Sequence, residues 1–219
     1  MGNRVSEFLV VGLGDSITAG NPGWDPDPAR RPFEDPGDDE TSQYLYWAAR
    51  AHSGMRFRNH GVGGERTDEI RARLETAIVG ADAIVVQGGI NDVVHGRSVE
   101  LAAHDLGAMV RRSKELAEVV LLPDVLPWNN GWPEAEPRIR ELNALIAVLA
   151  ETENVTFLPF HETLEDPELP GRMKAQWTPD GNHPSVEGHR RLGELAFRLP
   201  TGWAGSRERG IASESLVPR

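Results

Sequence analysis

Two short segments of the chain hold the residue types that nucleophilic catalysis needs. Ser16 comes directly after an apolar run at residues 8–13 and a Gly-Asp pair, so its hydroxyl would lie at the end of a buried strand. Asp180 and His183 are three positions apart in a turn, a spacing that lets a carboxylate bind one imidazole nitrogen while the other accepts a proton. Each segment also suits an ordinary turn. His189 faces away from His183, and we expect it to pack or to be solvated.

Two further segments can supply hydrogen-bond donors to a developing negative charge. Asn91 follows an apolar run and two glycines, and its side-chain amide is a neutral donor suited to an oxyanion, although asparagine also forms turns at such places. Residues 59–67 contain three glycines just before a predicted helix, which leaves backbone N–H groups unobstructed. Because this segment has neither a Gly-Lys-Ser/Thr ending nor a Gly-x-Gly-x-x-Gly pattern, the sequence disfavours a nucleotide site.

Four segments resemble, in chain order, the four sequence blocks of the SGNH hydrolases (the GDSL esterase and lipase family): Gly14-Asp15-Ser16, Asn59 with Gly64, Gly89-x-Asn91-Asp92 and Asp180-x-x-His183. Each block is short, but all four occur in order, each at a predicted strand end. The resemblance covers the chain from the first predicted strand to the last helix. It implies a five-stranded parallel sheet between helices. It also implies that Ser16 is the nucleophile, His183 the general base and Asp180 the partner that orients the imidazole.

The resemblance further implies an oxyanion hole made by the N–H groups of Ser16 and Gly64 and by the Asn91 side chain. Gly64 is taken from three nearby glycines because it lies five residues after Asn59. Such a site hydrolyses carboxylic esters of small or medium acyl groups through an acyl-enzyme intermediate, and it needs no metal or organic cofactor. The expected partner is therefore a small-molecule ester.

The pattern of apolar runs and amphipathic stretches independently predicts an α/β domain with a mainly parallel, doubly wound sheet of the flavodoxin type. The predicted strands are residues 8–13, 55–59, 83–87, 119–123 and 155–158, and the predicted helices are residues 42–52, 67–78, 99–117, 134–151 and 185–197. Thr67 and Ser98 are the expected N-caps of two of these helices. Ligands bind outside the carboxyl ends of the strands in such folds, so the candidate residues would meet at one edge of the sheet.

The composition and net charge of the chain exclude several kinds of site and disfavour several kinds of partner. The chain has 219 residues, 39% of them hydrophobic, enough for one domain with its own core. Its net charge is −11, which argues against nucleic acid or an anionic membrane as the main partner. Cysteine is absent, so disulfides, thiolate metal sites and a cysteine nucleophile are excluded. The apolar run near the N-terminus is too short for a signal peptide or a membrane span, which favours a cytoplasmic protein.

Two segments depart from the α/β pattern of a single domain expected over residues 1–200. Residues 21–41 hold seven acids, two arginines and five prolines, and they leave the sheet beside the candidate nucleophile. We expect either solvated surface or a negative flap that favours neutral esters over anionic ones at low salt. Residues 201–219 are rich in glycine and serine and end in Leu-Val-Pro-Arg, as a cleaved expression tag does.

Two alternative functions remain open from the sequence. A carbohydrate O-acetyl esterase or acetyltransferase is favoured by four tryptophans near the expected site, because aromatic rings stack on sugars; they are Trp24, Trp128, Trp132 and Trp177. Tryptophan is also a common packing residue, so these side chains equally suit loop anchoring. A non-catalytic binding module on the same fold is the second alternative, and the intact candidate residues disfavour it. The oligomeric state has no signal in the sequence.

Overall fold

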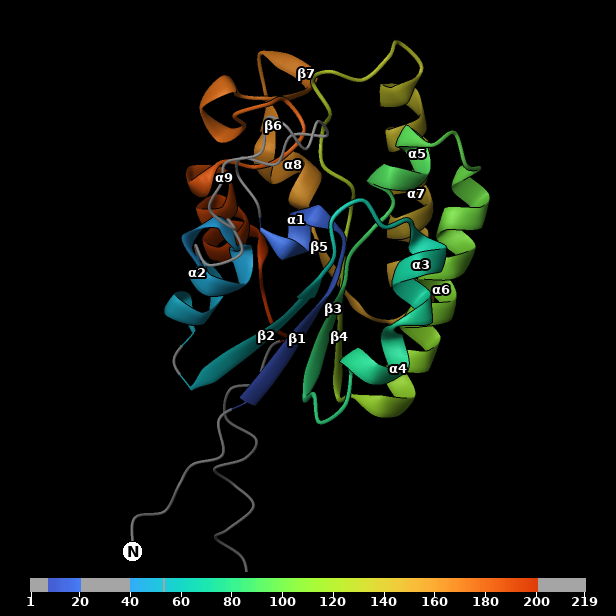
Figure 1. Cartoon of the computed structure of the whole chain (residues 1–219), viewed down its shortest axis with the longest axis vertical. Helices are drawn as coiled ribbons and strands as arrows, with labels where there is room; N and C mark the ends of the chain where they lie inside the picture. Colours follow the sequence, from blue (N-terminus) through green and yellow to red (C-terminus); the bar gives the residue numbers. More distant parts are fainter. Residues whose placement is uncertain (1–7, 21–39, 53, 201–219) are drawn as a thin grey trace, which may run out of the picture.

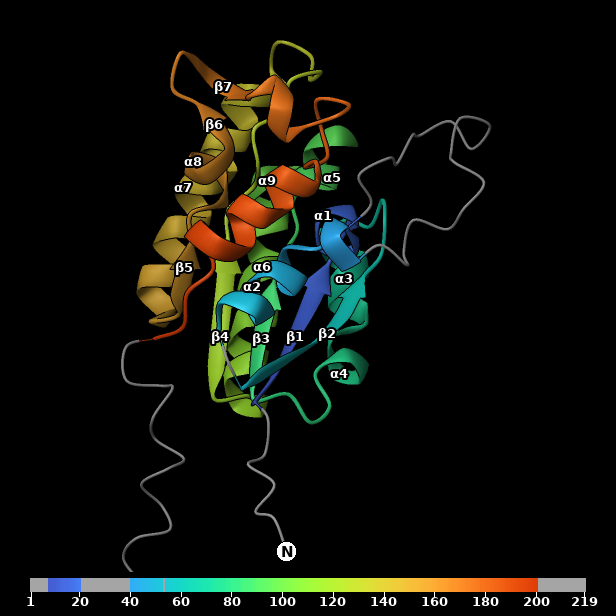
Figure 2. The same ribbon diagram turned by 90° about the vertical axis from the view of Figure 1, so that its left-hand side faces the viewer.

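The structure is a computed structural model that describes residues 8–20, 40–52 and 54–200. The acidic segment up to residue 39, Trp24 within it and the tail after residue 200 therefore lie outside the described residues, as do the predictions made for them. Figures 1 and 2 show the described part as a central sheet with helices packed on both faces.

The central sheet has five strands in the order β2-β1-β3-β4-β5, and every neighbouring pair is parallel. The strands are β1 (Phe8–Gly14), β2 (Met55–Gly61), β3 (Ala83–Val86), β4 (Val119–Pro123) and β5 (Thr156–Leu158). All five predicted strands are confirmed, and so is the doubly wound α/β class. A small antiparallel pair, β6 (Glu165–Asp166) and β7 (Leu169–Met173), lies beyond the carboxyl edge of the sheet (Figure 1).

The helices form the two outer layers. Those that carry named side chains below are α1 (Ser16–Ala19), α2 (Tyr44–Ala51), α3 (Thr67–Ala72), α4 (Leu74–Ala77), α5 (Ile90–Val94), α6 (Val99–Leu116), α7 (Ala135–Glu153), α8 (Phe160–Leu164) and α9 (Val186–Arg191). Short turns η3 (Glu40–Ser42) and η4 (Ala175–Trp177) and the π-helical η5 (Leu192–Ala196) complete the order. Helices α3, α4, α6 and α7 cover one face of the sheet, and α2 and α9 cover the other (Figure 1).

The side chains of β1 point alternately into two halves of the core, one on each face of the sheet. Val11 and Leu13 pack with α3, α6 and α7, while Val10 packs with α2, α8 and η5. Successive side chains of a strand point to opposite faces, so a strand covered on both sides is apolar throughout. On α7, Leu142 and Ile146 lie four positions apart on one face of the helix, and both are fully buried in the core.

The helix predictions differ from the structure in several places, among them residues 185–197, where α9 continues into the π-helical η5. The predicted helix over residues 67–78 is divided at Arg73 into α3 and α4. Ser98 is the N-cap of α6 and accepts a hydrogen bond from the Leu101 N–H at 3.2 Å, as expected. Thr67 is not an N-cap: it is the first residue of α3, and its hydroxyl donates to the Asp92 carboxylate instead. A distant charged acceptor therefore replaces the local backbone bond that the sequence suggested.

No helix within the described ranges is long and apolar enough to cross a membrane.

Candidate active site

The turn after β1 presents Ser16 at the carboxyl edge of the sheet. Asp15 is the N-cap of α1 and accepts a hydrogen bond from the Ile17 N–H at 2.9 Å, so Ser16 occupies the first helical position. A backbone N–H at this position has no acceptor within its own helix. Gln87, directly after β3, fastens the turn, because its Oε1 accepts hydrogen bonds from the Asp15 N–H at 3.1 Å and the Thr18 hydroxyl at 2.9 Å.

Ser16, His183 and Asp180 form one hydrogen-bonded chain, although 167 positions separate Ser16 from His183. The Ser16 Oγ lies 3.0 Å from His183 Nε2, and His183 Nδ1 lies 2.6 Å from Asp180 Oδ2. A carboxylate only accepts hydrogen bonds, so Nδ1 carries the proton that it donates. Nε2 is then the basic nitrogen and points at the serine hydroxyl. The structure thus brings together the three side chains that the sequence singled out.

The turn that carries Asp180 and His183 is held by its own hydrogen bonds. Asp180 Oδ1 accepts from the N–H groups of Asn182 at 2.9 Å and His183 at 2.7 Å. Partial burial opposes ionisation of Asp180, but the hydrogen bonds from the His183 ring and backbone outweigh it and lower the pKa of this carboxyl. Asp180 therefore stays charged and fixes the orientation of the His183 imidazole.

Two further acids near the site lie in buried surroundings. Asp15 is fully buried, and burial raises the pKa of its carboxyl to about 6, against the hydrogen bonds from Ile17 and Gln87. Asp124, at the end of β4, has its pKa raised to about 7 by burial, against hydrogen bonds from backbone N–H groups such as that of His161 at 2.7 Å. Both acids help to shape the loops around Ser16.

Asn91 and Gly64, the other expected donors, lie on neighbouring segments. The Asn91 side-chain NH2 donates to the Glu65 carbonyl at 2.9 Å, directly after Gly64 in the chain. An amide NH2 has two hydrogens, so one remains for another acceptor. Gly64 has a φ of +83°, a left-handed conformation that glycine adopts without strain. The structure thereby places the Gly64 peptide and the Asn91 amide next to each other.

The neighbouring Gly61 has a different task. It ends β2, and its N–H already donates to Asn59 Oδ1 at 2.8 Å. A Cβ added at Gly61 would lie 2.0 Å from the backbone nitrogen of Ala19, so only glycine lets β2 approach α1 this closely. The Gly61 N–H is therefore already engaged within its own turn.

Three residues support the site without a specific role from the sequence analysis, although Asn59 belongs to one of the four blocks that carry the resemblance. Gln87 holds the Ser16 turn as described, and Asn59 Nδ2 donates to the Thr18 carbonyl at 2.7 Å, which ties α1 to β2. Arg73 donates to the Gly14 carbonyl at 3.2 Å and pairs with Glu65 at 2.5 Å. A polar residue at a strand end could have pointed to Gln87. Arg73 lies within a helical pattern and had no such signal.

A small cavity of about 10 Å³ adjoins the candidate residues. Its lining includes Ile17, Ile90 and Asn182, which are the chain neighbours of Ser16, Asn91 and His183. The loop after β4 supplies the opposite wall. The apolar lining residues are Ile17, Ile90, Val125, Leu126, Pro127 and Phe160. A space of this size holds about one water-sized group.

The predicted substrate tryptophans divide into two kinds. Trp128 and Trp132 form an edge-to-face pair with ring centroids 5.2 Å apart, and Trp132 is 37% exposed. Trp177 is only 7% exposed and packs in the core, with the Arg191 guanidinium 4.2 Å and the Lys174 amine 5.3 Å from its ring centroid. Trp177 has no open ring face for a sugar, so the expectation that it binds substrate is withdrawn.

The segment that carries Trp128 and Trp132 is bonded to the turn that carries Asp180 and His183. The Asn129 N–H donates to the Gly181 carbonyl at 2.7 Å, and the Asn130 side chain donates to the Asp180 carbonyl. In the described part of the chain, no three His, Asp or Glu side chains gather as they would around a metal ion.

The family of the chain follows from comparison with known proteins. The model of the GDSL-like Lipase/Acylhydrolase family matches residues 13–191, a range that includes every candidate residue from Ser16 to His183. The chain belongs to this family of SGNH hydrolases. Sequence comparison with curated proteins finds no match.

Solved structures share the fold at low identity. A member of the lipolytic G-D-S-L family from Veillonella parvula is 19% identical, with a TM-score of 0.69 over 88% of this chain and 100% of that one. A GDSL-like lipase from Bacteroides thetaiotaomicron is 22% identical, with a TM-score of 0.65 over 86% and 85%. An acetylxylan esterase from Geobacillus stearothermophilus is 22% identical, with a TM-score of 0.66 over 88% and 96%.

Proposed function

We propose that this protein is a serine ester hydrolase that cleaves carboxylic esters of small acyl groups through an acyl-enzyme intermediate. The observation that carries the proposal is the hydrogen-bonded chain from Ser16 Oγ to His183 at 3.0 Å and on to Asp180 at 2.6 Å. A serine with a base in hydrogen-bond reach, and a third group that orients the base, is the arrangement that activates a hydroxyl nucleophile.

The reaction proceeds in two similar halves. His183 Nε2 takes the Ser16 proton as Oγ attacks the ester carbonyl, and the carbonyl oxygen becomes an oxyanion. The Asn91 amide and the N–H groups of Ser16 and Gly64 stabilise that charge. When the tetrahedral intermediate collapses, the alcohol leaves with the proton from His183. Water then attacks the acyl-enzyme as His183 accepts its proton, and when the second tetrahedral intermediate collapses His183 returns that proton to Ser16 Oγ and the acid is released.

The small cavity supports a preference for short acyl groups. The cavity is about 10 Å³, enough for about one water-sized group, and its lining includes the apolar Ile17 and Leu126. In a hydrophobic pocket, one additional methylene changes the specificity constant by roughly 10- to 200-fold. We therefore expect kcat/KM to fall as the acyl chain lengthens.

The test is a series of 4-nitrophenyl esters from acetate to octanoate, with Ser16→Ala as the control for background hydrolysis. Acetate should be the best substrate, and Leu126→Ala should reduce the preference for acetate over octanoate by about tenfold. Leu169→Ala is the matched control, because Leu169 is 57% exposed and outside the cavity lining. Activity that survives in Ser16→Ala would contradict the proposal, and a wild type inactive on every ester would favour the non-catalytic binding module.

A carbohydrate O-acetyl esterase is a second candidate, favoured by the Trp128 and Trp132 pair. The pair follows β4 on a segment that is bonded to the turn with Asp180, and Trp132 has an exposed ring. The acetylxylan esterase among the similar structures is an example of such an enzyme on the same fold. If this candidate is right, Trp132→Ala should raise KM for an acetylated oligosaccharide and leave 4-nitrophenyl acetate unaffected. An equal effect on both esters would make Trp132 a packing residue.

A further inference from the structure

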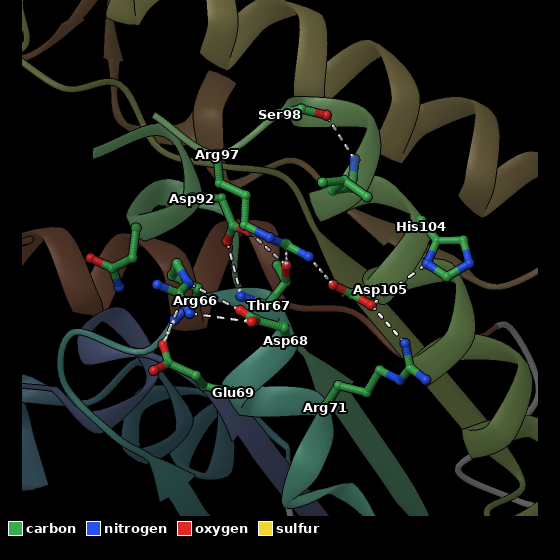
Figure 3. Close-up of polar contacts among 12 residues, drawn as sticks. Arg66, Thr67, Asp68, Glu69, Arg71, Asp92, Arg97, Ser98, His104 and Asp105 are labelled. Atoms are coloured by element: carbon green, nitrogen blue, oxygen red, sulfur yellow. Dashed lines mark hydrogen bonds and ion pairs between the residues drawn. The ribbon is translucent and has the colours of Figure 1, made fainter. Parts of the chain in front are cut away.

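One group of charged side chains links the segments that carry Gly64 and Asn91. Arg97, in the loop between α5 and α6, donates from Nη1 to Asp92 at 2.5 Å and to the Thr67 hydroxyl at 2.8 Å. From Nη2 it donates to Asp105 on α6 at 2.5 Å. Figure 3 shows the guanidinium between the two carboxylates. We call these four residues, Arg97, Asp92, Thr67 and Asp105, the Arg97 bridge.

The Arg97 bridge lies close in the chain to both candidate oxyanion donors. Thr67 is three residues after Gly64, and Asp92 directly follows Asn91. The Asp92 carboxylate accepts from the Thr67 N–H at 2.9 Å and from the Thr67 hydroxyl at 2.8 Å. The start of α3 and the first turn of α5 are therefore joined by a pair of bonds to one carboxylate.

Hydrogen bonds, and not packing, hold the Gly64 segment. Val62 is 42% exposed, and a Cβ added at Gly64 would find no heavy atom within 4 Å, so packing does not hold the middle of the segment. Glu65, directly after Gly64, is bonded to Asn91 and to Arg73, and both ends of the segment are bonded as well. The Val62 N–H donates to the Gly14 carbonyl at 2.9 Å at one end, and Thr67 is bonded to Asp92 at the other.

The Arg97 bridge is buried and firmly anchored. The Asp92 side chain is fully buried, that of Asp105 is 5% exposed and that of Arg97 is 20% exposed. The Arg97 N–H donates to the Asp92 carbonyl at 2.8 Å, and Arg71 of α3 bonds Asp105 at 2.7 Å. Buried ion pairs add little net stability, because desolvation offsets their attraction, but they hold their partners in one geometry. Removing the cation would leave two buried carboxylates facing each other.

We propose that Arg97 is a positioning residue for the oxyanion hole: by holding Asp92 against Thr67, it fixes the distance between the Gly64 N–H and the Asn91 amide. This inference rests on the proposed ester hydrolysis. Arg97 does not touch the substrate. Its effect is carried by Asp92 to both donors, which must converge on one oxygen atom as the charge develops.

The experiment compares the full chain with Arg97→Met on 4-nitrophenyl acetate. Misplacement of a catalytic group by about 1 Å can cost roughly 10²-fold, so kcat should fall by about 10- to 100-fold while KM stays within about twofold. Acylation and deacylation both form an oxyanion, so kcat/KM should fall with kcat. Arg97→Lys, which cannot bond both carboxylates in a fork, should recover activity only in part.

Arg112→Ala is the matched control. Arg112 lies on α6 and forms an ion pair with Glu75 at 2.6 Å, but this pair is exposed and belongs to no part of the site. Its removal should leave kcat unchanged. Thermal unfolding of each variant shows whether it is folded. If Arg97→Met does not fold, Thr67→Val removes only the hydroxyl bonds within the bridge, and a smaller fall in kcat at unchanged KM is expected.

A double variant distinguishes a role of Arg97 in positioning the oxyanion donors from a general loss of rigidity in the protein. In an Asn91→Ala background one of the two donors is already absent, so Arg97→Met should cost at least about threefold less than in the wild type. Equal losses in both backgrounds, or an unchanged kcat in folded Arg97→Met, would overturn the inference. Those outcomes leave the proposed function intact as long as wild-type hydrolysis depends on Ser16. A wild type without Ser16-dependent hydrolysis would overturn both.

Discussion

Replacing His189 with leucine should make the protein more resistant to acid, because this imidazole is buried without a polar partner. His189 lies in α9 and is 1% exposed. Among the described residues, neither of its ring nitrogens has a hydrogen-bond partner. Burial, and after it the charge of His183, lowers the pKa of His189 to about 3. The folded protein therefore keeps His189 neutral at pH values where the unfolded chain protonates it.

The size of the effect follows from the two pKa values. The ordinary pKa of a histidine side chain is 6.5, and the pKa of His189 in the folded protein is about 3. The stability that depends on keeping His189 neutral is therefore fully retained above pH 6.5. It is lost as the pH falls from 6.5 towards 3, because the unfolded state binds the proton first. At pH 5 the unfolded chain gains about 2 kcal/mol in this way, a large part of the stability of a typical domain.

The assay is urea unfolding of wild type and His189→Leu at pH 8 and pH 5. Carboxyl groups titrate in both proteins, so they cancel when the two free energies of unfolding are subtracted. That difference should shift in favour of the variant by about 2 kcal/mol between the two pH values. The exposed His95, changed to glutamine, is the control and should show no comparable shift. If wild type and His189→Leu lose stability in parallel, the reasoning is refuted.

Three other predictions concern the candidate catalytic residues, each measured as hydrolysis of 4-nitrophenyl acetate. Ser16→Ala and His183→Ala should each lower kcat by at least ~10³, and the double variant should lose little more, because these groups act as a unit. Additive losses of kcat in the double variant would show that Ser16 and His183 do not act as one nucleophile–base unit. Asp180→Asn should cost less than either, because Asp180 orients the imidazole without taking its proton; a loss as large as that of Ser16→Ala would give Asp180 a larger role. Asn91→Ala should lower kcat by about 10²- to 10³-fold with little change in KM, whereas a raised KM at unchanged kcat would make Asn91 a binding residue.

Local patterns in the sequence were sufficient for the long elements. A strand covered on both faces is apolar throughout, so the runs around Val85 and Leu121 stood out from their surroundings. The apolar stripe of α7 repeats at helical spacing and was equally clear. By contrast, α1, α5 and α8 have four or five residues each, about one turn of helix, which is too short for any period to show.

In the candidate site, too, the sequence predicted a contact between near neighbours in the chain but not a contact between distant ones. The turn with Asp180 and His183 is local, since three positions and a glycine at positive φ bring the carboxylate to the ring, and the sequence predicted that contact. The cap expected at Thr67 was wrong because its acceptor, Asp92, is 25 positions away. Nothing within a few residues of Thr67 shows such a partner.

The sequence by itself therefore determined the strands, the long helices, the family resemblance and the residues with the right chemistry. Only the tertiary structure decided what those residues touch. The parallel sheet brings the carboxyl ends of β1, β2 and β3 to one edge, and His183 reaches Ser16 across 167 positions of chain. Arg97 between two acids and Trp177 in the core are outcomes of the same kind. Local spacing governs backbone turns and apolar faces, whereas ion pairs and burial depend on which distant segments the packed sheet places side by side.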